Sequence, residues 1–329
     1  MRLRPITVLC CFATVLTLGV AGALGGCSSD SGGTGSSGEP LADAGGTTDS
    51  PSGGDSGTSD TGVGDTGTDA PSGGIGAGPY TIVYAGTFVG IDGRSVDDGK
   101  ATFEGLKLTG YTAKGQEADE SPKIGTNTAS DVAGSSLFAI GRWGGGITDG
   151  KFYEVGAAGK MTFAANGGFH YAIGVPTSSL PATGTVTYTV DKKTAATVSD
   201  GSSAPGTISG SLVIAYAGAA TKVALSVTID IPGNGTYTAE TTGGTADPSQ
   251  SEALVPNLTG PNAPKGIFYF NKNNLTNAGA ACGGGGSCSL GVDGAILGPA
   301  GETVVLAAHV YAGSGGSPKS VSGVLAFKK

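Results

Sequence analysis

The chain has 329 residues, of which 63 are glycine and only 13% are charged. A glycine inside a helix costs on the order of 0.5–1 kcal/mol relative to alanine, so this composition argues against a helical protein and favours strands and turns. The formal net charge of −8 gives no support to a nucleic-acid partner, because capture of nucleic acid needs a basic face.

Residues 1–26 have the pattern of a bacterial export signal. Two arginines lie near the start, an apolar run follows at 6–18, and Leu24-Gly25-Gly26 precedes Cys27. The apolar run is too short to span a bilayer of about 30 Å, which needs about 20 residues. The pattern resembles the lipobox of bacterial lipoproteins. That resemblance implies cleavage before Cys27 and attachment of lipid to this cysteine.

A lipidated Cys27 would hold the mature protein to a membrane, because two or three acyl chains anchor a protein stably. In lipoproteins of many Gram-negative bacteria, an aspartate directly after the lipidated cysteine is typical of retention in the inner membrane. Ser28 stands at this place here. We therefore expect a cell-envelope protein of the outer membrane, on either its periplasmic or its surface-exposed face.

The segment 27–78 is expected to be a disordered acidic linker. After its cysteine it consists almost wholly of Gly, Ser, Thr, Asp, Ala and Pro, and it contains eight acidic residues and no Lys or Arg. A segment of this composition cannot bury enough apolar surface to offset the entropy cost of ordering. Because the linker holds the acidic excess, residues 79–329 are nearly neutral.

From residue 80 onward, apolar and polar residues alternate with a period of two. The clearest example lies at 222–231, where Val223, Leu225, Val227 and Ile229 would share one face of a strand. Successive side chains of a strand point to opposite faces, so this pattern buries one face and leaves the other in water. No sustained helical period follows the export signal. The sequence therefore predicts an all-β fold.

Residues 79–180 are expected to form a smaller β domain, and residues 181–329 a β-barrel. The strand patterns of the first part lie at 80–90, 101–110, 136–143, 147–155, 161–165 and 168–175. Those of the second part lie at 184–190, 207–217, 222–231, 235–242, 253–259, 266–271, 289–298, 302–311 and 319–328. Strands at this spacing, joined by short turns, indicate a sandwich or an up-and-down barrel. We expect the barrel, because eight strands can close an antiparallel barrel that its own side chains fill. The short run at 266–271 either pairs outside the barrel or joins its neighbour.

Several segments are similar to the transferrin-binding-protein-like lipoproteins, over about residues 168–329. They are Phe169 to Thr177, Leu180 to Tyr188, Ala204 to Leu212, Val292 to Pro299 and Val321 to Phe327. The resemblance implies an eight-stranded antiparallel barrel, preceded by a handle-like β domain, on a lipid anchor. Related barrels bind host iron carriers, haem proteins or complement regulators. This chain differs from the large two-lobed receptors of that family in having one lobe.

The resemblance implies a non-enzymatic binding protein that captures a protein or small-solute ligand, with iron- or haem-related ligands among the candidates, through loops at one end of the barrel. The alternative is a structural or adhesive surface lipoprotein without a discrete ligand. No nucleophile motif such as Gly-x-Ser-x-Gly with partner residues occurs in the sequence. We therefore expect neither enzyme activity nor a cofactor.

Cys282 and Cys288 are predicted to form a disulfide. They are the cysteines that remain in the mature protein beside the lipidated one, and exported proteins keep such pairs oxidised. The four glycines between them allow the Cα atoms to approach to the required distance of about 4.4–6.8 Å. No histidine or further cysteine lies nearby in the sequence to complete a four-ligand metal site, so we expect no metal there.

Arg142 and Trp143, the latter the only tryptophan, have two interpretations. Arg and Trp are favoured at binding hot spots, so the pair is a candidate ligand-binding site at a loop tip. The alternative, which we favour, is a core tryptophan beside an arginine at a strand end. The two histidines, His170 and His309, each lie in a strand pattern. Both are expected to be packed or rim residues, and they could share a haem or metal ion only if the fold made them neighbours.

Overall fold

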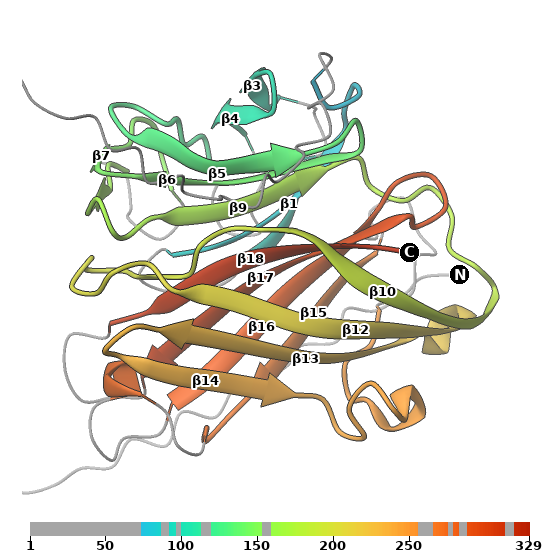
Figure 1. Cartoon of the computed structure of the whole chain (residues 1–329). Coiled ribbons are helices and arrows are strands. Elements are labelled where there is room, and N and C mark those ends of the chain that lie inside the picture. The colour runs from blue at the N-terminus through green and yellow to red at the C-terminus, as the bar shows by residue number, and fades with distance from the viewer. Residues whose placement is uncertain are drawn as a thin grey trace, which may run out of the picture. The chain divides into compact units, whose positions relative to one another are not determined.

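The computed structural model describes residues 74–86, 92–96, 100–112, 120–152, 159–255, 266–275, 279–282, 288–312 and 319–329. The export signal, Cys27 and the linker up to residue 73 lie outside these ranges. Within them, the regular elements are β-strands apart from three short 3-10 helices, η2 (Gly218–Ala220), η3 (Pro248–Gln250) and η4 (Ala280–Cys282), as Figure 1 shows. The predicted all-β fold is therefore confirmed. None of the helices in the described part is long and apolar enough to cross a membrane.

A five-stranded antiparallel sheet forms from the N-terminal part of the described chain. Its order is β2 (Asp92–Val96), β1 (Tyr80–Ala85), β9 (Phe169–Gly174), β6 (Phe138–Gly144) and β5 (Thr128–Gly134). Every residue of β1, β6 and β9 is buried, because both faces of the sheet are covered. One face carries an aromatic core, and the other packs against the barrel wall.

Two hairpins accompany the sheet, and they correct two predicted strands. The expected strand 101–110 is a hairpin of β3 (Thr102–Glu104) and β4 (Lys107–Gly110), because the chain turns back at Gly105, whose φ is 62°. The expected strand 147–155 is reduced to β7 (Gly146–Ile147), which pairs with β8 (Thr162–Phe163). Residues 153–155 lie outside the described part.

Eight strands form the barrel: β10 (Thr183–Lys193), β12 (Thr207–Ala217), β13 (Lys222–Ile231), β14 (Gly235–Glu240), β15 (Ile267–Lys272), β16 (Cys288–Leu297), β17 (Thr303–Ala312) and β18 (Val321–Lys328). All pairings are antiparallel, in the order β14-β13-β12-β10-β18-β17-β16-β15. The pair β10–β18 joins the first strand to the last. The short β11 (Thr197–Val198) adds to β18 beside this path. The predicted eight-stranded up-and-down barrel is confirmed, and it is nearly closed.

The barrel has one seam, between β14 and β15. These two strands contact each other without forming a paired ladder. The strand pairing beside the seam also shows which of two predicted segments, 253–259 or 266–271, belongs to the barrel. Residues 266–271 lie in β15 and pair with β16, while the described part of the expected strand 253–259 makes only an isolated bridge, from Leu254 to Lys222. The deciding feature is that Phe268 and Phe270 are both buried in the barrel core.

Apolar side chains from all eight strands fill the interior of the barrel. Val223, Leu225, Val227 and Ile229 of β13 are fully buried there, as the alternation predicts. The outer side of β16, β17 and β18 packs against β1 and β9 of the sheet, through small and branched side chains such as Val83, Ala172 and Val305. Because the interior is packed, a ligand would have to bind at the barrel's surface or loops.

Candidate functional site: a polar hollow beside the barrel seam

A hollow of about 520 Å³ lies beside the seam, and its volume falls in the range of about 300–1,000 Å³ that is typical of ligand sites. Thr238 and Glu240 of β14 and Lys272 of β15 contribute to its walls. The remaining lining comes from the loop that follows β14, through Thr241, Gly243, Gly244, Thr245 and Ala246. The hollow therefore joins two strands that are not paired with a loop at one end of the barrel.

The alternation along β14 explains why its two lining side chains face outward. Tyr237 and Ala239 are buried in the barrel core, so Thr238 and Glu240 point away from it and are exposed. β14 therefore presents the hydroxyl group of Thr238 and the carboxylate of Glu240 to the hollow.

The loop after β14 is shaped by glycine. Gly243 has a φ of 78°, and a Cβ added there would lie 2.6 Å from the backbone oxygen of Asp247. Only glycine fits this conformation and this close approach. The backbone N–H of Asp247 in turn donates to the carbonyl oxygen of Gly243 at 3.1 Å. The loop is therefore folded back on itself beside the hollow.

Charges also fix the loop. The Glu252 carboxylate accepts a hydrogen bond of 2.8 Å from the backbone N–H of Thr242. Partial burial raises the pKa of Glu252, but the hydrogen bonds from Thr242 and the positive charge of Lys272 outweigh it, so the pKa lies below its usual value. Glu252 is therefore ionised at neutral pH. Lys272 lies close enough to act on it, which places a positive charge beside the loop.

Trp143 lies in the aromatic core of the sheet and is fully buried. Its ring centroid is 5.0 Å from that of Phe169, and its Nε1–H donates to the carbonyl oxygen of Leu108 at 2.9 Å. Of the two predicted positions, the structure has the core position. A direct ligand-binding role for Arg142 and Trp143 stays a prediction.

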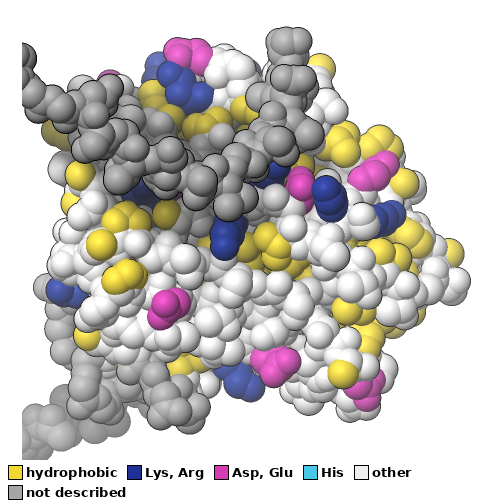
Figure 2. All heavy atoms as spheres, in the orientation of Figure 1, with side chains coloured by type: hydrophobic (Ala, Val, Ile, Leu, Met, Phe, Trp, Pro, Cys, Tyr) yellow, Lys and Arg dark blue, Asp and Glu magenta, His cyan; other side chains and the backbone are white. Residues whose placement is uncertain are grey.

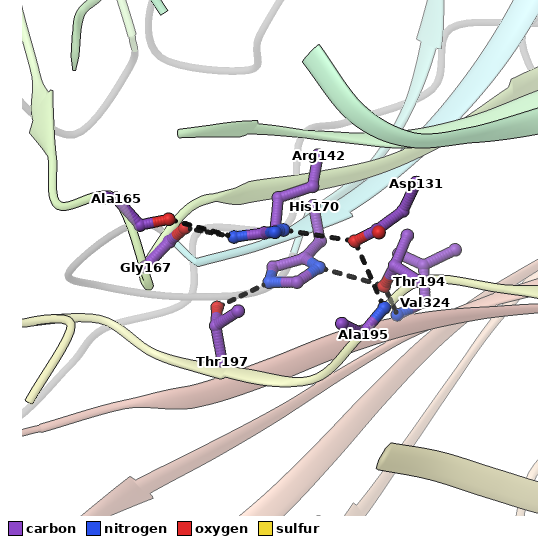
Figure 3. Close-up of polar contacts among 9 residues, drawn as sticks. All are labelled: Asp131, Arg142, Ala165, Gly167, His170, Thr194, Ala195, Thr197 and Val324. Atoms are coloured by element: carbon purple, nitrogen blue, oxygen red, sulfur yellow. Dashed lines mark hydrogen bonds and ion pairs between the residues drawn. The ribbon is translucent and has the colours of Figure 1, made fainter. Parts of the chain in front are cut away.

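Arg142 lies on the opposite face of the same strand, toward the barrel, and is only 7% exposed. Its Nε donates to Oδ2 of Asp131 at 3.1 Å, and Nη1 donates to the carbonyl oxygen of Gly167 at 2.9 Å. Asp131 also accepts a hydrogen bond of 3.2 Å from the backbone N–H of Ala195, which follows β10. Figure 3 shows that Asp131 thereby connects the sheet with the chain leaving a barrel strand.

His170 extends this connection. Its Nδ1 lies 3.0 Å from Oγ1 of Thr194 and its Nε2 lies 2.7 Å from Oγ1 of Thr197 (Figure 3). Burial, with the nearby charge of Arg142, lowers the pKa of His170 to about 3, so the ring is neutral at neutral pH. We call Asp131, Arg142, His170, Thr194 and Thr197 the polar bridge. Because both ring nitrogens contact threonine hydroxyls, His170 is a packed residue and has no nitrogen left for a metal.

His309 lies on β17 and is 2% exposed. Its ring centroid is 5.5 Å from that of Tyr311, and burial lowers its pKa to about 4. The sequence allowed a shared metal or haem site only if the fold made the two histidines neighbours, and this stays a prediction. Both ring nitrogens of His170 contact threonine hydroxyls, which opposes its use as a metal ligand. Across the residues that the structure describes, no group of three or more His, Cys, Asp or Glu side chains could hold a metal ion.

The predicted disulfide is present. It joins Cys282 of η4 to Cys288 at the start of β16, with the Cα atoms 5.3 Å apart. The backbone N–H of Ala280 donates to the carbonyl oxygen of Asn234 at 2.6 Å, so the bridged segment lies against the β13–β14 turn. This turn precedes β14, whereas the loop of the hollow follows β14. The disulfide therefore supports the opposite end of the barrel.

Sequence reasoning missed the residues of the hollow. Glu240 and Lys272 lie 32 positions apart in the sequence and belong to strands that do not pair, so no local pattern relates them. The only available signal was the glycine pair Gly243-Gly244 directly after a strand pattern, which indicates a tight loop.

Comparisons with known proteins do not assign the chain to a family. No protein-family model and no curated protein matches it. Solved structures that match include two mutants of Transferrin Binding Protein B from Haemophilus parasuis Hp5, at 12% identity and TM-scores of 0.33 and 0.36. Intact Ap-TbpB, with its N and C lobes, matches at 12% identity and a TM-score of 0.30. The matches cover 76% of this chain but only 44–45% of those chains.

Proposed function

We propose that this chain is a non-enzymatic, lipid-anchored protein of the cell envelope that captures a ligand at one end of its barrel. The observation that carries the proposal is the polar hollow beside the seam, which a barrel-end loop shapes. The packed interior supports it, because the hollow offers a binding place that the core does not. The ligand is a small solute or a segment of a protein, and iron- or haem-related compounds are included in the test because the family resemblance of the sequence names them.

The proposal assigns a separate role to each part of the chain. Residues 1–26 direct export, and lipid on Cys27 attaches the mature protein to the outer membrane. The linker up to residue 78 separates the folded part from the bilayer. Residues 79–180 form a small β domain and residues 181–329 the barrel that carries the site. The packing of the sheet on the barrel wall supports the view that the two parts act as one binding unit.

The test is a thermal-unfolding screen of the full-length protein in detergent against sugars, amino acids, peptides and haem. A compound that binds only the folded state stabilises it by about 2.7 kcal/mol at a concentration of 100 Kd. We expect at least one compound to raise the unfolding temperature of the native protein. Ala246→Trp, which fills the hollow, should remove the effect. Ala219→Trp, on the exposed turn between β12 and β13, is the matched control and should keep it.

Two outcomes would contradict the proposal. If no compound raises the unfolding temperature, the alternative of a structural or adhesive lipoprotein without a discrete ligand is favoured. If a compound binds the Ala246→Trp variant as well as it binds the native protein, ligand capture occurs elsewhere.

A further inference from the structure

We infer that the hollow binds a neutral, hydroxyl-rich ligand, namely an uncharged oligosaccharide that continues onto the outer face of β12, β13 and β14. The inference rests on the proposed function, since it names the chemical class of ligand for the same site. It follows from the groups that line the hollow, from their charges and from the strands beside them.

The lining offers both donors and acceptors of hydrogen bonds. The hydroxyl groups of Thr238 and Thr245 can do both, the Glu240 carboxylate accepts only, and the Lys272 ammonium donates only. A sugar hydroxyl also donates and accepts at the same time, so neighbouring hydroxyls of one sugar can use a carboxylate and an ammonium together. Few other small ligands match such a mixed set without carrying charge themselves.

The charges in and around the hollow oppose a strongly charged ligand. Glu240 and Lys272 cancel each other within the lining. Glu252, which is ionised, lies near Lys272 and repels anions. Bound cations are disfavoured as well, because the lining contains a single carboxylate and carries its own ammonium group. A neutral ligand avoids both costs.

The lining also opposes a large apolar ligand. It contains no aromatic side chain and no aliphatic side chain larger than alanine. Sites for flat apolar groups are lined mainly by hydrophobic and aromatic residues. A haem macrocycle would therefore find no complementary surface in this hollow.

Thr238 and Glu240 also belong to a larger face, on which nine outward positions of β12, β13 and β14 carry hydroxyl or carboxylate groups. The next outward positions of β12 and β13, beyond these nine, are Val213, Ala215, Ala224 and Lys222. The register places them in three cross-strand rows: Thr207, Asp230 and Thr236; Ser209, Thr228 and Thr238; and Ser211, Ser226 and Glu240. Figure 2 shows few hydrophobic or basic side chains on the surface over these front strands of Figure 1. We call these nine residues the hydroxyl face.

The hydroxyl face by itself is common, because threonine and serine suit the solvent side of strands. What distinguishes this one is its continuity with a hollow of ligand size through Thr238 and Glu240. Some of its groups are already ordered: Thr228 and Thr238 hydroxyls lie 3.0 Å apart, and Thr236 donates to Oδ1 of Asp230 at 2.7 Å. A chain of sugars could start in the hollow and extend along these rows.

The experiment measures binding of maltotetraose, cellotetraose and tetra-N-acetylchitotetraose, all uncharged, to the full-length protein in detergent by calorimetry. We expect at least one to bind with a Kd of about 1 mM or tighter. Glu240→Gln keeps the shape of the side chain and removes its charge, and it should weaken binding at least about tenfold, which corresponds to about 1.4 kcal/mol. Glu104→Gln, an exposed change on the β3–β4 hairpin, is the matched control and should leave Kd unchanged.

The same experiment separates a failure of the inference from a failure of the proposed function. If an amino acid, a peptide or haem binds the native protein and does not bind Ala246→Trp, and no tetrasaccharide binds, the hollow is a binding site and the oligosaccharide inference is wrong. If a tetrasaccharide binds and Glu240→Gln has no effect, the inference about the site is also wrong. If nothing binds, both are wrong. Thermal unfolding of Glu240→Gln verifies that the variant is folded.

Discussion

Glu240 and Lys272 line one hollow although β14 and β15, the strands that carry them, are the two members of the barrel that do not pair. An unpaired seam is costly in a sheet, because it leaves edge groups of the backbone without ladder partners. In this barrel it also creates space, and a glycine-shaped loop borders that space. The proposed site therefore depends on the incomplete closure of the barrel.

Trp143→Ala should destabilise the protein by about 3–5 kcal/mol, the usual cost of removing a large buried aromatic side chain. The reason is that Trp143 is fully buried and also donates a hydrogen bond to Leu108. Urea unfolding of the full chain measures the change. Tyr269→Ala serves as control, because Tyr269 is 52% exposed, and it should change stability by clearly less than Trp143→Ala does. Unchanged stability in Trp143→Ala would contradict the core assignment.

His170 should make the protein less stable as the pH falls. Its pKa is about 3 in the folded state and about 6.5 when unfolded, so the unfolded state binds more protons between these values. The contribution of neutral His170 to the free energy of unfolding is therefore complete above about pH 6.5, and it is lost as the pH falls toward about pH 3. At about pH 5 the loss should reach about 2 kcal/mol relative to neutral pH.

The measurement is the free energy of unfolding in urea between about pH 5 and pH 6.5, a range in which ordinary carboxylates titrate little. His170→Gln removes the titration and should flatten the slope. His309, whose pKa is about 4, keeps titrating in this variant, so part of the slope should remain. An identical slope in the native protein and in His170→Gln would show that burial of His170 does not drive the pH dependence.

The Cys282–Cys288 disulfide should contribute about 2 kcal/mol of stability, since it closes a short loop and the entropic gain grows with loop length. The double variant Cys282→Ala and Cys288→Ala should unfold at correspondingly lower urea concentration. Thiol titration of the mature native protein, unfolded without reductant, should detect no free thiol. A titre of two thiols would refute the bridge.

Cys27→Ser should release the protein from the membrane, because the serine cannot carry the thioether-linked lipid that the lipobox pattern implies. Fractionation of cells followed by immunoblotting measures this. Ser28→Asp should keep the protein lipidated and move it from the outer to the inner membrane. Membrane attachment of Cys27→Ser at the native level would rule out lipid on this residue as the anchor.

Alternation along the sequence was enough to predict an all-β fold, because side chains such as Val223 and Leu225 report directly which face of a strand is buried. The choice of a barrel over a sandwich came from the number of strands and from the family resemblance. Cysteine content in an exported chain was likewise enough to predict the disulfide. Periodicity could not tell that 266–271 rather than 253–259 completes the barrel, since both are short apolar runs and only pairing with β16 distinguishes them.

The polar bridge and the hollow could be decided only by the tertiary structure. His170 contacts Thr194 and Thr197, and Glu240 lines the same hollow as Lys272. These residues come from segments that are distant in the sequence, and no local pattern predicts that they lie together. Local patterns record whether a position is buried, because burial selects the residue type. They do not record which distant polar group a side chain faces, because that depends on how strands are ordered and where the barrel fails to close.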